Sequence, residues 1–162
     1  MITLINNCMS FAFAQFAKFS RRSFPSALFI LVLLAGDLSV RASLPVGWSD
    51  ADIGAPGLAG AAAYSNGNWT VTGSGMDLAN AADQCNFASN SYGSDGSITA
   101  QVTSLQNTAP GSGGSEAGVM FRNDTTAGAA NVNLVVTATQ GVSFQWRSST
   151  GAQMANQMVG GR

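Results

Sequence analysis

Short runs of alternating apolar and polar residues fill the chain beyond residue 60, and clusters of glycine, asparagine and serine separate them. A period of two places every second side chain on the same face of a β-strand. The pattern therefore predicts an all-β fold, an antiparallel β-sandwich. The expected strands are Ala61–Tyr64, Trp69–Thr72, Gln84–Ser89, Ser97–Leu105, Ala117–Arg122, Asn131–Ala138 and Val142–Ser148.

Two connections carry information about strand pairing. Asn66-Gly67 between the first two strands accepts the positive φ of a tight turn, which predicts a hairpin. The apolar rows of the last two strands lie on the same face of the sheet only if the residue numbers of each directly opposed pair add up to an even number. Val136 opposite Phe144 is an example of such a pair. We therefore expect a three- or five-residue loop through Thr139-Gln140-Gly141, Gly141 at positive φ, and core positions for Val132, Leu134, Val136, Val142, Phe144 and Trp146.

The first 42 residues have a different pattern. Three cations, Lys18, Arg21 and Arg22, precede the apolar run 27–36, and Val40-Arg41-Ala42 places small residues before Ser43. This order is typical of a secretory signal peptide, here a helical segment 1–42 that is cleaved before Ser43. The chain is then exported, to the extracellular space, the cell surface or the periplasm. The alternative is an uncleaved membrane anchor, although the apolar run is shorter than the roughly 20 residues that cross a bilayer.

Two further features of this segment bear on how the chain starts and leaves the cell. The stretch Ser20–Phe24 resembles a twin-arginine export motif, so the export route stays open between this pathway and the general one. Met9 is a second candidate for the first residue of the protein.

Charge and composition exclude several function classes. The chain is 46% hydrophobic and 9% charged, and it contains no histidine. Without histidine, neither Ser-His-Asp nor Cys-His catalysis is available. Residues 43–162 contain three arginines, no lysine and seven carboxylates, a net charge of −4. Such a chain has little with which to bind nucleic acid or anionic lipid.

One cysteine, Cys85, remains after residue 42. It shares strand parity with Phe87, which predicts a buried thiol. A reactive thiolate needs a neighbouring histidine or another cation, so we expect no catalytic cysteine.

Six stretches carry a more specific signal: LPVGW at 44–48, DIG at 52–54, DGSITAQV at 95–102, QNT at 106–108, AGVMFR at 117–122 and VSFQWR at 142–147. Together they resemble the concanavalin A-like jelly-roll modules of secreted bacterial proteins, which are related to the regulation-of-enolase-like domain family. The resemblance covers about residues 44–151. It implies a jelly-roll domain over 43–162. Family members continue through further strands, so it also implies a C-terminal truncation without a closing strand. Glu116 is a departure, because similar modules often have a small or basic residue there.

The resemblance implies a non-catalytic accessory role beside other domains of large exoproteins. Carbohydrate is the ligand class that the fold suggests, with a polysaccharide or cell-surface glycan as partner and a binding or adhesion function. The alternative is a structural spacer, or a remnant of a larger protein, that has no ligand of its own.

Aromatic and polar side chains provide the candidate ligand residues. Tyr92 and Asp95 lie in a Ser/Gly-rich loop and are expected to be exposed. Arg122, Gln145 and Arg147 point away from the apolar rows of their strands and can form a polar sheet face. The alternative for these three is an ordinary solvated face. Trp69 and Trp146 share faces with apolar residues, so we expect them in the core.

An enzyme or a metal site is not expected. Glycoside hydrolases use two carboxylates, whereas Glu116 is the single glutamate of residues 43–162 and is expected to pair with a neighbouring arginine. Calcium could use Asp50, Asp52 and Asp95, but it needs six or more oxygens. We therefore expect no cofactor, with Ca²⁺ as the alternative. Asp52-Ile53-Gly54 is expected to begin the first strand.

Overall fold

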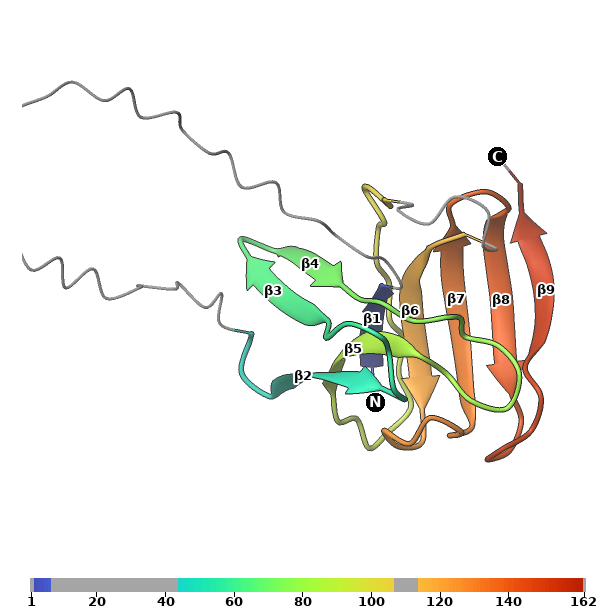
Figure 1. Ribbon diagram of the computed structural model, residues 1–162. Coiled ribbons are helices and arrows are strands. Elements are labelled where there is room, and N and C mark those ends of the chain that lie inside the picture. The colour runs from blue at the N-terminus through green and yellow to red at the C-terminus, as the bar shows by residue number, and fades with distance from the viewer. Residues whose placement is uncertain (1, 7–43, 107–113, 162) are drawn as a thin grey trace, which may run out of the picture. The chain divides into compact units, whose positions relative to one another are not determined.

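The computed structural model describes residues 2–6, 44–106 and 114–161. This part of the chain contains nine strands and no helix. Seven strands form one antiparallel sheet in the order β2-β5-β1-β6-β7-β8-β9, and β3 and β4 form a separate hairpin (Figure 1). The strands are β1 (Ile2–Asn6), β2 (Trp48–Ile53), β3 (Ala61–Ser65), β4 (Asn68–Thr72), β5 (Cys85–Asn90), β6 (Glu116–Arg122), β7 (Asn131–Thr137), β8 (Gly141–Arg147) and β9 (Ala155–Gly160). The predicted all-β, antiparallel class is confirmed.

Local turn chemistry forms the two hairpins as the sequence predicts. Asn66 and Gly67 have φ values of 50° and 82°, and Ser65 pairs with Asn68 on either side of them. Between β7 and β8, Thr137 pairs with Gly141, which leaves a three-residue loop, and Gly141 has a φ of 97°. The prediction that the residue numbers of opposed pairs add up to an even number is confirmed. The example pairing was wrong by two residues, because Phe144 lies opposite Leu134.

Hydrophobicity predicts that the apolar faces of β7 and β8 are buried, but the structure buries their opposite, mostly polar faces. The apolar rows do share one face, but that face stays partly accessible, with 43% of Leu134 and 37% of Phe144 exposed. Trp146 is half-buried beside Phe144, at 5.5 Å between ring centroids. The expectation that these rows form the core is wrong. The buried side chains of the two strands are mostly polar: Asn131, Asn133, Val135, Thr137, Ser143, Gln145 and Arg147.

A segment that crosses the sheet explains this inversion. Residues 73–84 lead from β4 across β6 and β7 before the chain enters β5 (Figure 1). The segment is tied down by backbone hydrogen bonds, from Asp83 N to Ala127 O at 2.9 Å and from Met154 N to Asn80 O at 2.9 Å. It brings Leu78 and the Asp83 carboxylate onto the polar face, and both side chains are buried there.

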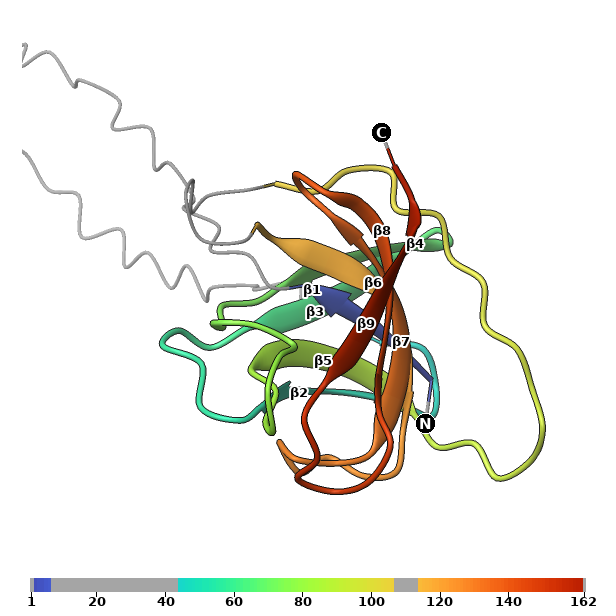
Figure 2. The same ribbon diagram turned by 90° about the vertical axis from the view of Figure 1, so that its right-hand side faces the viewer.

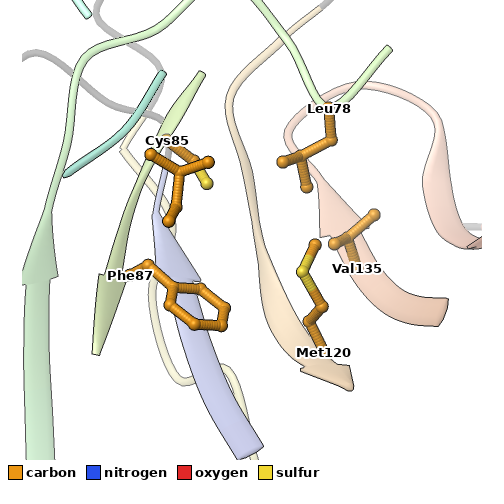
Figure 3. Packing of buried hydrophobic residues seen from close by; sticks show 6 residues of the cluster. Leu78, Cys85, Phe87, Met120 and Val135 are labelled. Atoms are coloured by element: carbon orange, nitrogen blue, oxygen red, sulfur yellow. The ribbon is translucent and has the colours of Figure 1, made fainter. Parts of the chain in front are cut away.

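A small apolar core lies between this segment and the sheet. Leu78 packs with Cys85 and Phe87 of β5, Met120 of β6 and Val135 of β7 (Figure 3). Ile53 completes the cluster. The predicted burial of Cys85 is confirmed, and burial raises the pKa of its thiol to about 12. A thiol in that environment is a packing group.

Four sequence predictions differ from the structure. Ser97–Leu105 forms no strand, and β9 pairs with β8 where no closing strand was expected. Asp52 and Ile53 end β2 rather than begin the first strand. Ile2–Asn6, placed by sequence in the signal helix, form strand β1 between β5 and β6. The rest of the predicted signal peptide, residues 7–42, lies outside the described residues.

Within the described ranges, the structure has no helix long and apolar enough to cross a membrane.

Close contact between β6 and β7 makes Gly118 sensitive to substitution. A Cβ atom at this position would overlap Leu134 O and lie 2.7 Å from Val135 Cα. Because both neighbours are backbone atoms in the middle of a sheet, we expect Gly118→Ala to lower the free energy of unfolding by about 1–3 kcal/mol. Urea denaturation measures the loss. Gly93→Ala, at a site with no neighbour within 4 Å, is the control, and an equal effect in both variants would contradict the prediction.

Candidate functional site

The polar face is centred on a buried carboxylate with two guanidinium partners. Asp83 lies 2.6 Å from Arg147 (Oδ1 to Nη2) and 3.2 Å from Arg122 (Oδ2 to Nη1). The side chains of all three residues are fully excluded from solvent in these pairs. Asn131 Nδ2 donates a further hydrogen bond to Asp83 Oδ2 at 3.2 Å. The carboxylate is therefore paired and hydrogen-bonded on both oxygens, as a buried charge must be.

The remaining arginine donors bind backbone carbonyls. Arg147 donates to Asn80 O, Ala152 O and Ala129 O at 3.1–3.2 Å. Arg122 donates from Nε to Asp124 O at 2.6 Å, and its guanidinium carbon lies 5.3 Å from the centre of the Phe87 ring. The alternative of a solvated polar face is wrong, because Arg122, Gln145 and Arg147 are all buried. Arg122 and Arg147 are placed together, as predicted, but their donors hold loops and Asp83 in place.

A groove beside this cluster contains Gln145, the third member of the predicted polar face. We call it the Glu116 groove, and it has a volume of about 700 Å³. Its walls come from segment 74–80, β6, β8 and β9. Its main polar lining residues are Asp77, Glu116, Thr137, Gln140, Ser143, Gln145 and Asn156, and its apolar ones are Met76, Leu78, Met154 and Met158.

Glu116 is the most unusual group in this groove. It is only 9% exposed, and Gln145 Nε2 donates to its Oε1 at 3.3 Å. No salt bridge joins it to an arginine among the described residues, so the expected ion pair is wrong. Burial, with a smaller contribution from Asp77, raises the pKa of Glu116 to about 7, against the opposing hydrogen bond from Gln145. Burial also raises the pKa of Asp77.

The groove contains unused hydrogen-bonding capacity. Gln145 is 6% exposed, and its Oε1 has no hydrogen-bond partner among the residues that the structure describes. A buried acceptor without a partner costs free energy that a bound donor would recover. When it is protonated, the Glu116 carboxyl adds an O–H donor, and Ser143 adds a hydroxyl, so the groove can exchange hydrogen bonds with a polar, uncharged ligand.

Tyr92 and Asp95 lie elsewhere, in the connection between β5 and β6. Both are exposed, and Tyr92 donates from its hydroxyl to Asp95 O at 3.0 Å. Neither lines the Glu116 groove. The structure therefore distributes the five predicted ligand residues over three places: this turn, the buried ion-pair cluster and the groove.

A second groove has an aromatic wall. Trp48, Tyr64 and Trp69 form a cluster of tilted rings, with ring centroids 4.6 Å apart between the two tryptophans and 5.1 Å apart between Tyr64 and Trp69. Trp69 is half-buried here, not in the core. This aromatic groove has a volume of about 870 Å³, and segment 97–104 lines much of its other side.

The Asp50-Ala51-Asp52 pair has a structural role. Asp52 accepts hydrogen bonds from Gly60 N at 3.1 Å and Asn86 Nδ2 at 3.2 Å, and Asp50 accepts from Ala62 N at 3.0 Å. The bonds from Gly60 and Ala62 join β2 to the start of β3, and the bond from Asn86 joins β2 to β5. Among the described residues, no group of three or more carboxylate, cysteine or histidine side chains could hold a metal ion.

Comparisons with known proteins give no assignment: no family model matches the chain, and neither a curated protein nor a solved structure matches it significantly.

The ion-pair cluster predicts a large effect of neutralising Asp83. Asp83→Asn leaves two guanidinium groups buried without a counter-charge, so we expect a loss of about 3–5 kcal/mol in the free energy of unfolding. Chemical denaturation checks this value. Asp95→Asn makes the same change on an exposed side chain and should stay within about 0.5 kcal/mol of the wild type. Equal stability of the two variants would show that the cluster is not buried in solution.

The environment of Glu116 predicts a pH dependence of stability. Its pKa is 4.5 ordinarily and about 7 in the fold, so the native state holds a proton that the unfolded state releases. Stability should therefore fall by about 2–3 kcal/mol as the pH rises from 4.5 to 7, and then level off. Thermal denaturation between pH 4.5 and 8 measures the change. Glu116→Gln, which stays neutral, should lose most of this slope, and an unchanged slope would count against the assignment.

Proposed function

We propose that this protein is an exported, non-catalytic jelly-roll module of the concanavalin A-like type that binds carbohydrate in the Glu116 groove. The observation that carries the proposal is the pair formed by Gln145 and Glu116. A buried amide oxygen without a partner lies beside a buried carboxyl group, in a groove large enough for a ligand. Sites of this kind place a few polar groups among apolar ones.

The lining favours a neutral, polyhydroxylated ligand. Sugars present hydroxyl groups that both donate and accept, and they present apolar C–H faces. Amide and hydroxyl groups of Gln145, Ser143 and Asn156 can satisfy the former, and the methionines of the groove can cover the latter. An anionic ligand fits poorly, because no arginine or lysine of the described part of the chain lines the groove and the nearby guanidinium groups are already paired with Asp83.

Export is the second part of the proposal. The charged, apolar and small-residue order of residues 18–42 supports a signal peptide. The jelly-roll assignment draws on the antiparallel sheet order and on the stretches AGVMFR and VSFQWR, which form β6 and β8.

A glycan array and polysaccharide sedimentation assays test the proposal on the exported protein. We expect binding of at least one neutral polysaccharide, and Gln145→Ala should weaken it about tenfold, the equivalent of one hydrogen bond. Gln157→Ala is the matched control, because Gln157 is an exposed glutamine opposite Phe144 on the other sheet face. Absence of binding to every glycan would favour the structural spacer instead.

A further inference from the structure

The strand in the middle of the large sheet comes from the segment that export is expected to remove. β1 pairs along its whole length with β5 on one side and β6 on the other. Its residues, Ile2–Asn6, belong to the predicted signal peptide, and they also precede Met9, the second candidate start. The inference below rests on the export that we propose, since cleavage before Ser43 takes β1 away.

Loss of β1 would open a slot in the most buried part of the fold. Phe87 of β5 and Met120 of β6 lie on either side of β1 and are both fully buried (Figure 3). Both strands would keep a row of backbone N–H and C=O groups that no longer had partners. Unpaired strand edges bind another strand readily, and buried backbone groups without partners are costly.

We propose that Ile98–Thr103 of the same chain takes this slot once residues 1–42 are gone. The stretch alternates Ile98, Ala100 and Val102 with Thr99, Gln101 and Thr103, the pattern of a half-buried strand. In the structure it forms no strand, and most of its residues are exposed. Figure 2 shows residues 91–106 as an open arc that leaves the sheet.

The direction of the chain between β5 and β6 is the one that a strand in the place of β1 needs. β1 is antiparallel to both neighbours, so β5 and β6 run in the same direction. The connection from residue 90 to residue 116 must therefore run back along the sheet, which is the direction that a strand in the slot requires. Residues 91–97, with Gly93 and Gly96, supply turn residues for a hairpin from β5. The segment already lies close, because it lines the aromatic groove together with Ala117 and Gly118 of β6.

The alternation of side chains determines how residues 98–103 would align with β5 and β6, because their apolar residues must lie on the apolar face of the sheet. Leu4 of β1 lies opposite Ala88 on β5 and Val119 on β6. Ala100 at this position sets Ile98 opposite Phe121 and Val102 opposite Ala117, so the apolar residues join the apolar row of the sheet. Gln101 then lies opposite Gly118, which has no side chain, on the face that already holds buried amides.

The same chain is favoured over a second molecule as the source of the strand. The segment is tethered to both strands that border the slot, so its effective concentration there is high. The exchange would also remove one wall of the aromatic groove, whereas the walls of the Glu116 groove come from other parts of the chain.

Hydrogen exchange tests the proposal without any substitution. The full chain is made by cell-free synthesis without membranes, and the processed protein is collected after export from a bacterial host, its N-terminus read by mass spectrometry. We expect the amides of residues 98–103 to exchange at least about 100-fold more slowly in the processed protein than in the full chain. Equal rates in the two samples, or an exported protein that keeps Ile2–Asn6, would overturn the proposal.

A cysteine pair tests the register. Neighbouring strands place opposed Cα atoms about 4.5–5.5 Å apart, within disulfide range. Ala100→Cys with Val119→Cys, in a Cys8→Ser background, should form an intramolecular disulfide in the processed protein and stay reduced in the full chain. Gln101→Cys with Val119→Cys, whose side chains would lie on opposite faces, is the matched control. A disulfide-linked dimer, or equal cross-linking in both pairs, would contradict the proposed strand.

Polysaccharide binding, measured on the same two samples, separates this inference from the proposed function. Slow exchange at residues 98–103 without glycan binding would support the strand and count against the carbohydrate site. Glycan binding with unchanged exchange would do the reverse.

Discussion

The position of one carboxylate determines which face of the sheet is inside. Asp83 accepts from two buried guanidinium groups, and these also hold the backbone of the loops around them. An isolated charge in this place would be very costly, so the three groups are stable only together. Once they are assembled, β6, β7 and β8 must turn their polar rows inward, and the apolar rows of β7 and β8 remain partly exposed.

The same constraint produces the candidate site. Segment 73–84 carries Asp83 to the sheet and also forms one wall of the Glu116 groove. Glu116 shares the inward parity of Arg122 on β6 but lies beyond the reach of either guanidinium, so it is buried with an amide partner instead. Its raised pKa follows from that position. A polar interior therefore supplies both the ion pairs that organise the fold and the unsatisfied groups that a ligand can use.

Sequence reasoning succeeded where the cause is local. Asn66-Gly67 and Gly141 determine two hairpins, and strand parity placed Cys85 beside Phe87. It failed where the cause is distant in the chain, because no local pattern brings Asp83 to Arg147 across 64 residues. Glu116 and Arg122 are an even number of residues apart on β6, so strand alternation alone places them on the same face. The sequence interpretation missed this because Glu116 is the first residue of the strand. The strand predicted at Ser97–Leu105 is absent, and β1 lies between β5 and β6.

The central claim is that the polar rows of β6 and β8 are inside. Side-chain NMR of the arginine Nε–H groups in the exported protein tests it most directly, since residues 43–162 contain only Arg122, Arg147 and Arg162. The account predicts two sharp, slowly exchanging signals from Arg122 and Arg147, both lost when the protein unfolds. Rapid exchange of both signals with water would contradict it, because the polar face would then be solvated and the apolar rows of β7 and β8 would form the interior.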